Sequence, residues 1–138
     1  MYGKFLHTID AKGRLFIPFR LREKLGKGFY VTISWESCLT IYSMERWENA
    51  EEKLKSMSQT AQMEMRSIFS NAVYLELDAQ GRVLLPQNLR DHVSLTKDVT
   101  IIGTGLYVQI WDSATYKPVE DLEMDRETLK SVIDKYGF

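Results

Sequence analysis

Two short segments of this 138-residue chain carry the same arrangement of aspartate, glycine and arginine. They read Asp10-Ala11-Lys12-Gly13-Arg14 and Asp78-Ala79-Gln80-Gly81-Arg82. Asp at the first position of a four-residue turn accepts hydrogen bonds from the turn's own N–H groups, and Gly at the fourth adopts a positive φ without strain. Arg directly after the turn lies beside the Asp, where its planar guanidinium suits a phosphate or a guanine edge. The motif therefore predicts either an Asp–Arg pair that locks a turn or an arginine presented to an anion.

The two turns belong to a longer internal repeat. Residues 10–22, DAKGRLFIPFRLR, and residues 78–90, DAQGRVLLPQNLR, are identical at seven of thirteen positions. Weaker similarity continues through apolar runs at 29–33 and 99–103. A module of about 43 residues is too small to bury a core of its own. The two copies are therefore expected to share one sheet, as a pseudo-symmetric pair of intertwined modules.

Each copy is expected to begin with a bulged β-hairpin around its turn. Pro18 and Pro86 follow the second strands and suit the first turn of a short helix, where a missing N–H is not needed. Apolar residues at helical spacing predict a helical linker after Trp47 and one amphipathic helix after Pro118. The predicted fold is α+β, mainly β with helices, and it divides into repeat 1 (5–47), a helical linker (48–75), repeat 2 (76–119) and a C-terminal helical tail (120–138).

Charge is distributed unevenly along the chain. The whole sequence has 18 Lys+Arg against 19 Asp+Glu, and a net charge of −1 taken alone disfavours a polyanionic partner. Residues 1–30, however, hold seven cationic side chains against two acidic ones, whereas residues 111–138 hold four against seven. The basic residues of the first copy are Lys4, Lys12, Arg14, Arg20, Arg22, Lys24 and Lys27, and His7 joins them below neutral pH. This density favours a basic binding face over an ordinary solvated surface.

Several other classes of protein are disfavoured. The single cysteine, Cys38, allows neither an internal disulfide nor a zinc site built from several thiolates. No apolar run approaches the roughly 18 residues of a membrane span, and the N-terminus lacks the pattern of a signal peptide. His7, His92 and Cys38 do not form a nucleophile–base or metal-binding motif. We therefore expect a cytoplasmic protein that is not an enzyme, with no cofactor, metal or small-molecule substrate.

The doubled motif resembles the MraZ family. The residues that carry the resemblance are Gly3-x3-His7-x-Ile9-Asp10-Ala11-Lys12-Gly13-Arg14-x2-Ile17-Pro18, and then Asp78-x2-Gly81-Arg82-x3-Pro86. The resemblance covers residues 3–116 and leaves the tail unmatched. It implies two SpoVT-AbrB-type repeats folded as a swapped-hairpin β-barrel, with chains assembled into a homo-oligomeric ring. It also implies a transcriptional regulator that binds repeated boxes of double-stranded DNA upstream of the division and cell-wall gene cluster, in the cytoplasm at the nucleoid.

The resemblance places DNA contact at Arg14, with Lys12 beside it. Together with the nearby basic residues, the candidate DNA-binding set is Lys4, His7, Lys12, Arg14, Arg20, Arg22 and Arg82, and the structural turn residues are Asp10, Gly13, Asp78 and Gly81. The second turn has Gln80 where the family frequently has Lys, which makes DNA contact by copy two less favoured. The alternative function is an AbrB-like antitoxin or protein-interaction module.

Overall fold

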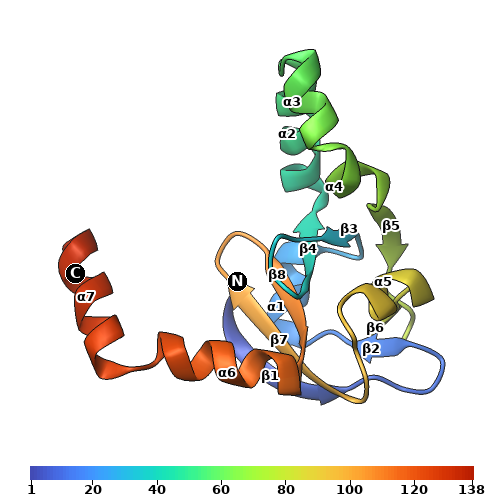
Figure 1. The fold of residues 1–138 in the computed structure, drawn as a ribbon. Coiled ribbons are helices and arrows are strands. Elements are labelled where there is room, and N and C mark those ends of the chain that lie inside the picture. The colour runs from blue at the N-terminus through green and yellow to red at the C-terminus, as the bar shows by residue number, and fades with distance from the viewer.

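Antiparallel strand pairing builds the fold (Figure 1). The computed structural model describes all residues, 1–138. Its strands are β1 (Tyr2–Thr8), β2 (Arg14–Phe16), β3 (Gly28–Ile33), β4 (Leu39–Ser43), β5 (Val73–Glu76), β6 (Arg82–Leu84), β7 (Asp98–Thr104) and β8 (Val108–Asp112). Six of them form one sheet in the order β1-β7-β8-β4-β3-β5, while β2 and β6 pair separately as a two-stranded ribbon. The predicted α+β class is confirmed.

The two repeats exchange strands with each other. β1 of the first repeat pairs with β7 of the second, and β5, the strand that leads into the second turn, pairs with β3 of the first. The ribbon also joins one strand from each repeat. Equivalent residues of the two copies fill a shared core of 17 buried apolar side chains, among them Leu15 with Val83, Ile17 with Leu85 and Leu21 with Leu89. The predicted pseudo-symmetric pair of intertwined modules is therefore confirmed.

The β-hairpin expected at each turn is confined to its tip. Around the first turn, Asp10 N donates to Arg14 O and one isolated bridge joins Ile9 to Leu15. Beyond that point β1 and β2 separate, one into the main sheet and the other into the ribbon. The reason is the length of the available partners. β1 pairs over all seven of its residues with β7, whereas β2 has only three residues to offer.

Two short helices follow the prolines that the repeats share. α1 (Phe19–Leu25) and α5 (Gln87–His92) begin directly after Pro18 and Pro86, as predicted. The linker contains α2 (Met44–Lys55), α3 (Gln59–Glu64) and α4 (Arg66–Ser70). The Ser43 hydroxyl accepts a hydrogen bond from Arg46 N at 3.3 Å and so caps α2. α2 starts against the sheet, where Trp47 stacks on Tyr30 of β3, and its far end projects outward together with α3 (Figure 1). The chain returns to the sheet through α4.

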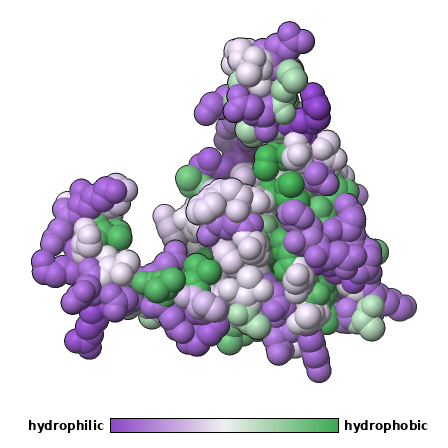
Figure 2. All heavy atoms as spheres, in the orientation of Figure 1, coloured by the Kyte–Doolittle hydropathy of each residue, from purple (hydrophilic) through white to green (hydrophobic).

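The tail contains two helices instead of the single one predicted after Pro118. α6 (Ser113–Glu123) begins directly after its N-cap residue Asp112 and includes Pro118, and α7 (Arg126–Tyr136) follows it. Lys4 Nζ meets Glu120 Oε2 at 2.6 Å and ties α6 to β1. α7 extends away from the body of the molecule (Figure 1), and Figure 2 shows hydrophobic residues on the surface of both helices. The exposed apolar residues of α7 are Leu129, Val132, Ile133 and Tyr136.

Candidate nucleic-acid interface

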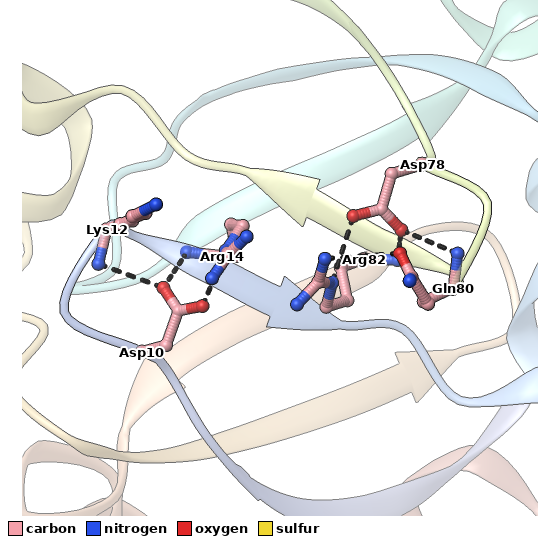
Figure 3. A network of polar contacts seen from close by, with 6 residues as sticks. All are labelled: Asp10, Lys12, Arg14, Asp78, Gln80 and Arg82. Carbon is pink, nitrogen blue, oxygen red and sulfur yellow. Dashed lines mark hydrogen bonds and ion pairs between the residues drawn. The ribbon is translucent and has the colours of Figure 1, made fainter.

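The first turn is organised around the carboxylate of Asp10 (Figure 3). Asp10 Oδ1 accepts hydrogen bonds from Lys12 N and Arg14 N, both at 2.9 Å, and Oδ2 accepts one from Arg14 Nε at 2.6 Å. Gly13 closes the turn by donating from its N to Asp10 O, with a φ of 90°. These bonds, led by the one from the Arg14 backbone, lower the pKa of the Asp10 carboxyl. The turn therefore holds Arg14 by Nε and leaves its two terminal nitrogens unbonded within the chain.

The second turn repeats this geometry with one difference. Asp78 Oδ1 accepts from Gln80 N and Arg82 N at 2.9 Å, and Oδ2 accepts from Arg82 Nε at 2.9 Å. The pKa of Asp78 is lowered as well, mainly by the backbone N–H of Arg82. Here, however, Arg82 Nη2 also donates to Gln80 Oε1 at 3.2 Å. Because Lys12 stands at the Gln80 position in copy one and offers no acceptor, Arg14 keeps a freer guanidinium than Arg82.

The ribbon presents both arginines on its outer face. In its register, Arg14 lies opposite Leu84, Leu15 opposite Val83 and Phe16 opposite Arg82. The middle pair is fully buried, so the residues on either side of it point outward. Arg14 and Arg82 are diagonal neighbours across the strands, a relation that spaces Cα atoms by about 7–8 Å. Figure 3 shows them lying between the two turns, one from each repeat.

Two of the other predicted residues adjoin this ribbon. The His7 ring lies 5.3 Å from the Phe16 ring, centre to centre. Arg22 Nε donates to Ile17 O at 2.7 Å, and its guanidinium lies over the Phe16 ring at 4.6 Å. His7 and Arg22 thus both pack against Phe16. Arg22 is also committed to contacts inside the protein.

The remaining two lie in different surroundings. Arg20 is exposed on α1 and forms no ion pair with another side chain. Lys4 lies on β1 and pairs with Glu120 of the tail. The structure therefore brings Arg14, Arg82, His7 and Arg22 to one region and directs Lys4 toward α6.

One residue of this region, Arg90 on α5, was not among the residues predicted from sequence. Arg90 Nε donates to Leu85 O at 2.9 Å, and its guanidinium lies against Gly13 of the first turn. The sequence repeat does align Arg90 with Arg22, which is one of the predicted residues. Its position over the other repeat's turn depends on the strand exchange, which no local pattern encodes.

Features that would suggest other chemistry are sparse. No group of three or more His, Cys, Asp or Glu side chains is arranged to hold a metal ion, and no helix has both the length and the apolar character needed to cross a membrane. Cys38 is buried, and desolvation raises the pKa of its thiol to about 12. An open groove of about 580 Å³ lies among α2, α3 and α4, with Leu54, Met63 and Phe69 in its lining.

Comparison with known proteins identifies the family. A family model described as "MraZ protein", in a description that also compares the family to antitoxins, matches residues 1–67 and again residues 68–131. The chain belongs to the MraZ family. The two matches divide it into the same two copies as its internal repeat, and the resemblance inferred from the doubled motif is confirmed.

Relatives of this MraZ chain are similar over most of its length. A protein of Acetivibrio thermocellus is 42% identical over 140 residues, covering 99% of this chain and 98% of the relative. One of Heliobacterium modesticaldum is 49% identical over 112 residues (79% and 78%), and one of Thermoanaerobacter sp. is 43% identical over 120 residues (85% and 84%). All three are named "Transcriptional regulator MraZ". The family is thus one of transcriptional regulators, a class distinct from enzymes.

Proposed function

We propose that this chain is a sequence-specific regulator that binds double-stranded DNA through the β2–β6 ribbon. The observation that carries the proposal is the pair of outward arginines, each anchored by Nε to the carboxylate of its own turn. The major groove of DNA admits a two-stranded β-ribbon, and an arginine fork matches the O6 and N7 acceptors of guanine. Anchoring removes side-chain freedom before binding, so less is lost when the complex forms.

Copy one is proposed to make the stronger contact. Arg14 has free terminal nitrogens and Lys12 carries a charge beside it, whereas Arg82 is partly satisfied by Gln80. His7, Arg20 and Arg22 add positive charge near the first copy, with Lys4 further away on β1. Asp10, Gly13, Asp78 and Gly81 hold the turns. The ribbon's outer face also has Phe16 and Leu84, apolar groups of the kind that contact thymine methyls.

Assembly into a homo-oligomeric ring would let several ribbons act together. A weak contact repeated on one particle gains affinity through effective concentration when the DNA sites are repeated at matching spacing. The exposed apolar stripe of α7 and the groove among α2, α3 and α4 are available for contacts between chains. The proposed targets are repeated boxes upstream of the division and cell-wall gene cluster, and the proposed location is the cytoplasm, at the nucleoid.

DNA binding is tested by fluorescence anisotropy with the region upstream of the chain's own gene, in a series of salt concentrations. We expect Arg14→Ala to abolish specific binding and Arg82→Ala to weaken it less. Lys12→Gln gives the first turn the residue of the second. It should make the slope of log binding constant against log salt concentration less steep by about 0.9, the value for a single phosphate neutralised by one cation. Adding Gln80→Lys to Lys12→Gln should restore the native slope. Lys130→Ala on α7 is the control for charge. Binding by Arg14→Ala equal to that of the native chain would refute the proposal.

Ring assembly and the alternative antitoxin function are each tested on the same purified protein. Light scattering in the binding buffer should give a mass that is a multiple of 16.1 kDa. A stable monomer would contradict the ring. Co-purification of a small partner in a fixed ratio would favour the antitoxin function over an autonomous regulator.

A further inference from the structure

The glycines of the two turns are buried, although the residues before them are exposed. Lys12 and Gln80 face solvent, whereas Gly13 and Gly81 do not. In each case the cover is an arginine of the other repeat. The guanidinium of Arg90 lies against Gly13, and a Cβ placed on that glycine would come within 2.6 Å of Arg90 Cζ. Each turn is thus covered across the pseudo-two-fold axis.

Arg90 is joined to the first turn by a short path of hydrogen bonds. Its Nε donates to Leu85 O at 2.9 Å, and Leu85 N donates to Gly13 O at 2.9 Å. Leu85 follows β6, so this connection comes entirely from the second repeat. Side chain and backbone of that repeat therefore fix Gly13 from two directions.

The same arrangement holds the second turn. Arg22 Nε donates to Ile17 O at 2.7 Å, Ile17 N donates to Gly81 O at 3.0 Å, and the Arg22 guanidinium lies against Gly81. Equivalent residues therefore make the same contact in both repeats. Lysine would not replace arginine here, because it has neither the Nε donor nor the planar face that lies flat on a glycine.

We propose that Arg90 is a positioning residue for the DNA-contacting turn of the other repeat. By holding Gly13, Arg90 fixes the turn N–H groups that bond Asp10, and through Asp10 it fixes the direction of Arg14. The second repeat thereby contributes to DNA binding by the first without contacting DNA. This inference rests on the proposed function for its DNA part, while its structural part stands alone.

The structural part is tested without DNA, by amide hydrogen exchange on the full chain. Arg90→Ala should speed exchange at residues 12–14 of the first turn about tenfold, equivalent to ~1.4 kcal/mol, and leave residues 80–82 unchanged. Arg22→Ala should give the reverse pattern. Both variants lack one arginine and one bond to a carbonyl, so each controls for the other. Exchange that rises equally in both turns, or in neither, would overturn the proposal.

The DNA part is tested by binding measurements on the same variants. Arg90→Ala should weaken binding about tenfold, Arg90→Lys should not restore it, and Lys130→Ala should bind as the native chain does. At low salt, where the non-specific binding that remains in Arg14→Ala can be measured, adding Arg90→Ala should weaken that binding no further, because Arg90 acts through Arg14. Still weaker binding by that double variant, or rescue by lysine, would mean a direct cationic contact and would refute positioning. If Arg14→Ala itself bound normally, the proposed function would fail while the exchange result would still stand.

Discussion

Replacing Gly13 by alanine should destabilise the chain for two separable reasons. The first is backbone strain, since φ at Gly13 is 90°, and an L-residue in the left-handed region costs ~1–2 kcal/mol. The second is the collision with Arg90, whose guanidinium must leave and break its 2.9 Å bond to Leu85 O. Breaking a bond from a charged donor at a partly buried carbonyl adds ~1–2 kcal/mol. The expected total is ~2–4 kcal/mol.

The chain contains a control glycine at which alanine would add backbone strain without a collision. Gly26 has a φ of 76°, and an alanine Cβ there would meet nothing within 4 Å. Its ψ of −171° puts Gly26 in a backbone region essentially restricted to glycine, so Gly26→Ala should reduce the free energy of unfolding by ~1–3 kcal/mol through strain alone. For a chain of this length, 1 kcal/mol shifts the unfolding midpoint by about 3–4 °C. The midpoint should fall by about 3–10 °C in Gly26→Ala and by about 7–14 °C in Gly13→Ala.

The assay is thermal and urea unfolding at one fixed protein concentration, followed by tryptophan fluorescence. A third measurement removes the collision by placing Gly13→Ala in the Arg90→Ala background. There Gly13→Ala should cost only its own backbone strain, ~1–2 kcal/mol. An unchanged effect of Gly13→Ala when Arg90 is absent would show that the Arg90–Gly13 contact does not contribute to stability.

Three further predictions concern protonation, thiol reactivity and base reading. The pKa of Asp10 and of Asp78 is lowered, so the stability that each ionised carboxylate contributes is present above pH 3.8 and is lost as pH falls through the folded-state pKa. The variant with both residues changed to Asn should therefore lose stability to urea less steeply between pH 6 and pH 2 than the native chain does. An equally steep loss in the two proteins would contradict this prediction. Cys38, with its pKa raised to about 12, should resist a thiol reagent at pH 8 until the chain is unfolded, and rapid labelling of native protein would disprove its protection. If Phe16 or Leu84 contacts thymine methyls, replacing thymine with uracil in the DNA should weaken binding by the native chain and not by the corresponding Ala variant.

The turns were predictable from sequence because their chemistry is local. Every hydrogen bond that the Asp10 side chain makes reaches a residue no more than four positions away, so spacing and residue type were sufficient. The duplication then required a shared core, since neither copy could bury one alone. The cap of α2 is local in the same way, since the Ser43 hydroxyl accepts from Arg46 N only three residues further on.

The features that could not be predicted depend on competition between distant partners. Whether β1 pairs with β2 or with β7 is decided by how many residues each can offer, which appears only in the assembled sheet. The same is true of Lys4, which belongs to the basic N-terminal region in sequence but meets Glu120 in the fold. Arg90 over Gly13 is a further consequence of the exchange, and charge patterns give no sign of it.

The strand exchange between repeats has a consequence for symmetry. Two such modules on separate chains would complete each other only as a dimer, with identical turns and a stability that depends on concentration. The covalent linker through α2, α3 and α4 makes the encounter intramolecular and so independent of concentration. It also allows the halves to diverge, as Lys12 and Gln80 have done. A symmetric dimer matches a palindrome, whereas a tandem chain has a direction of its own. The proposed dominance of the first turn therefore predicts DNA boxes that all point the same way.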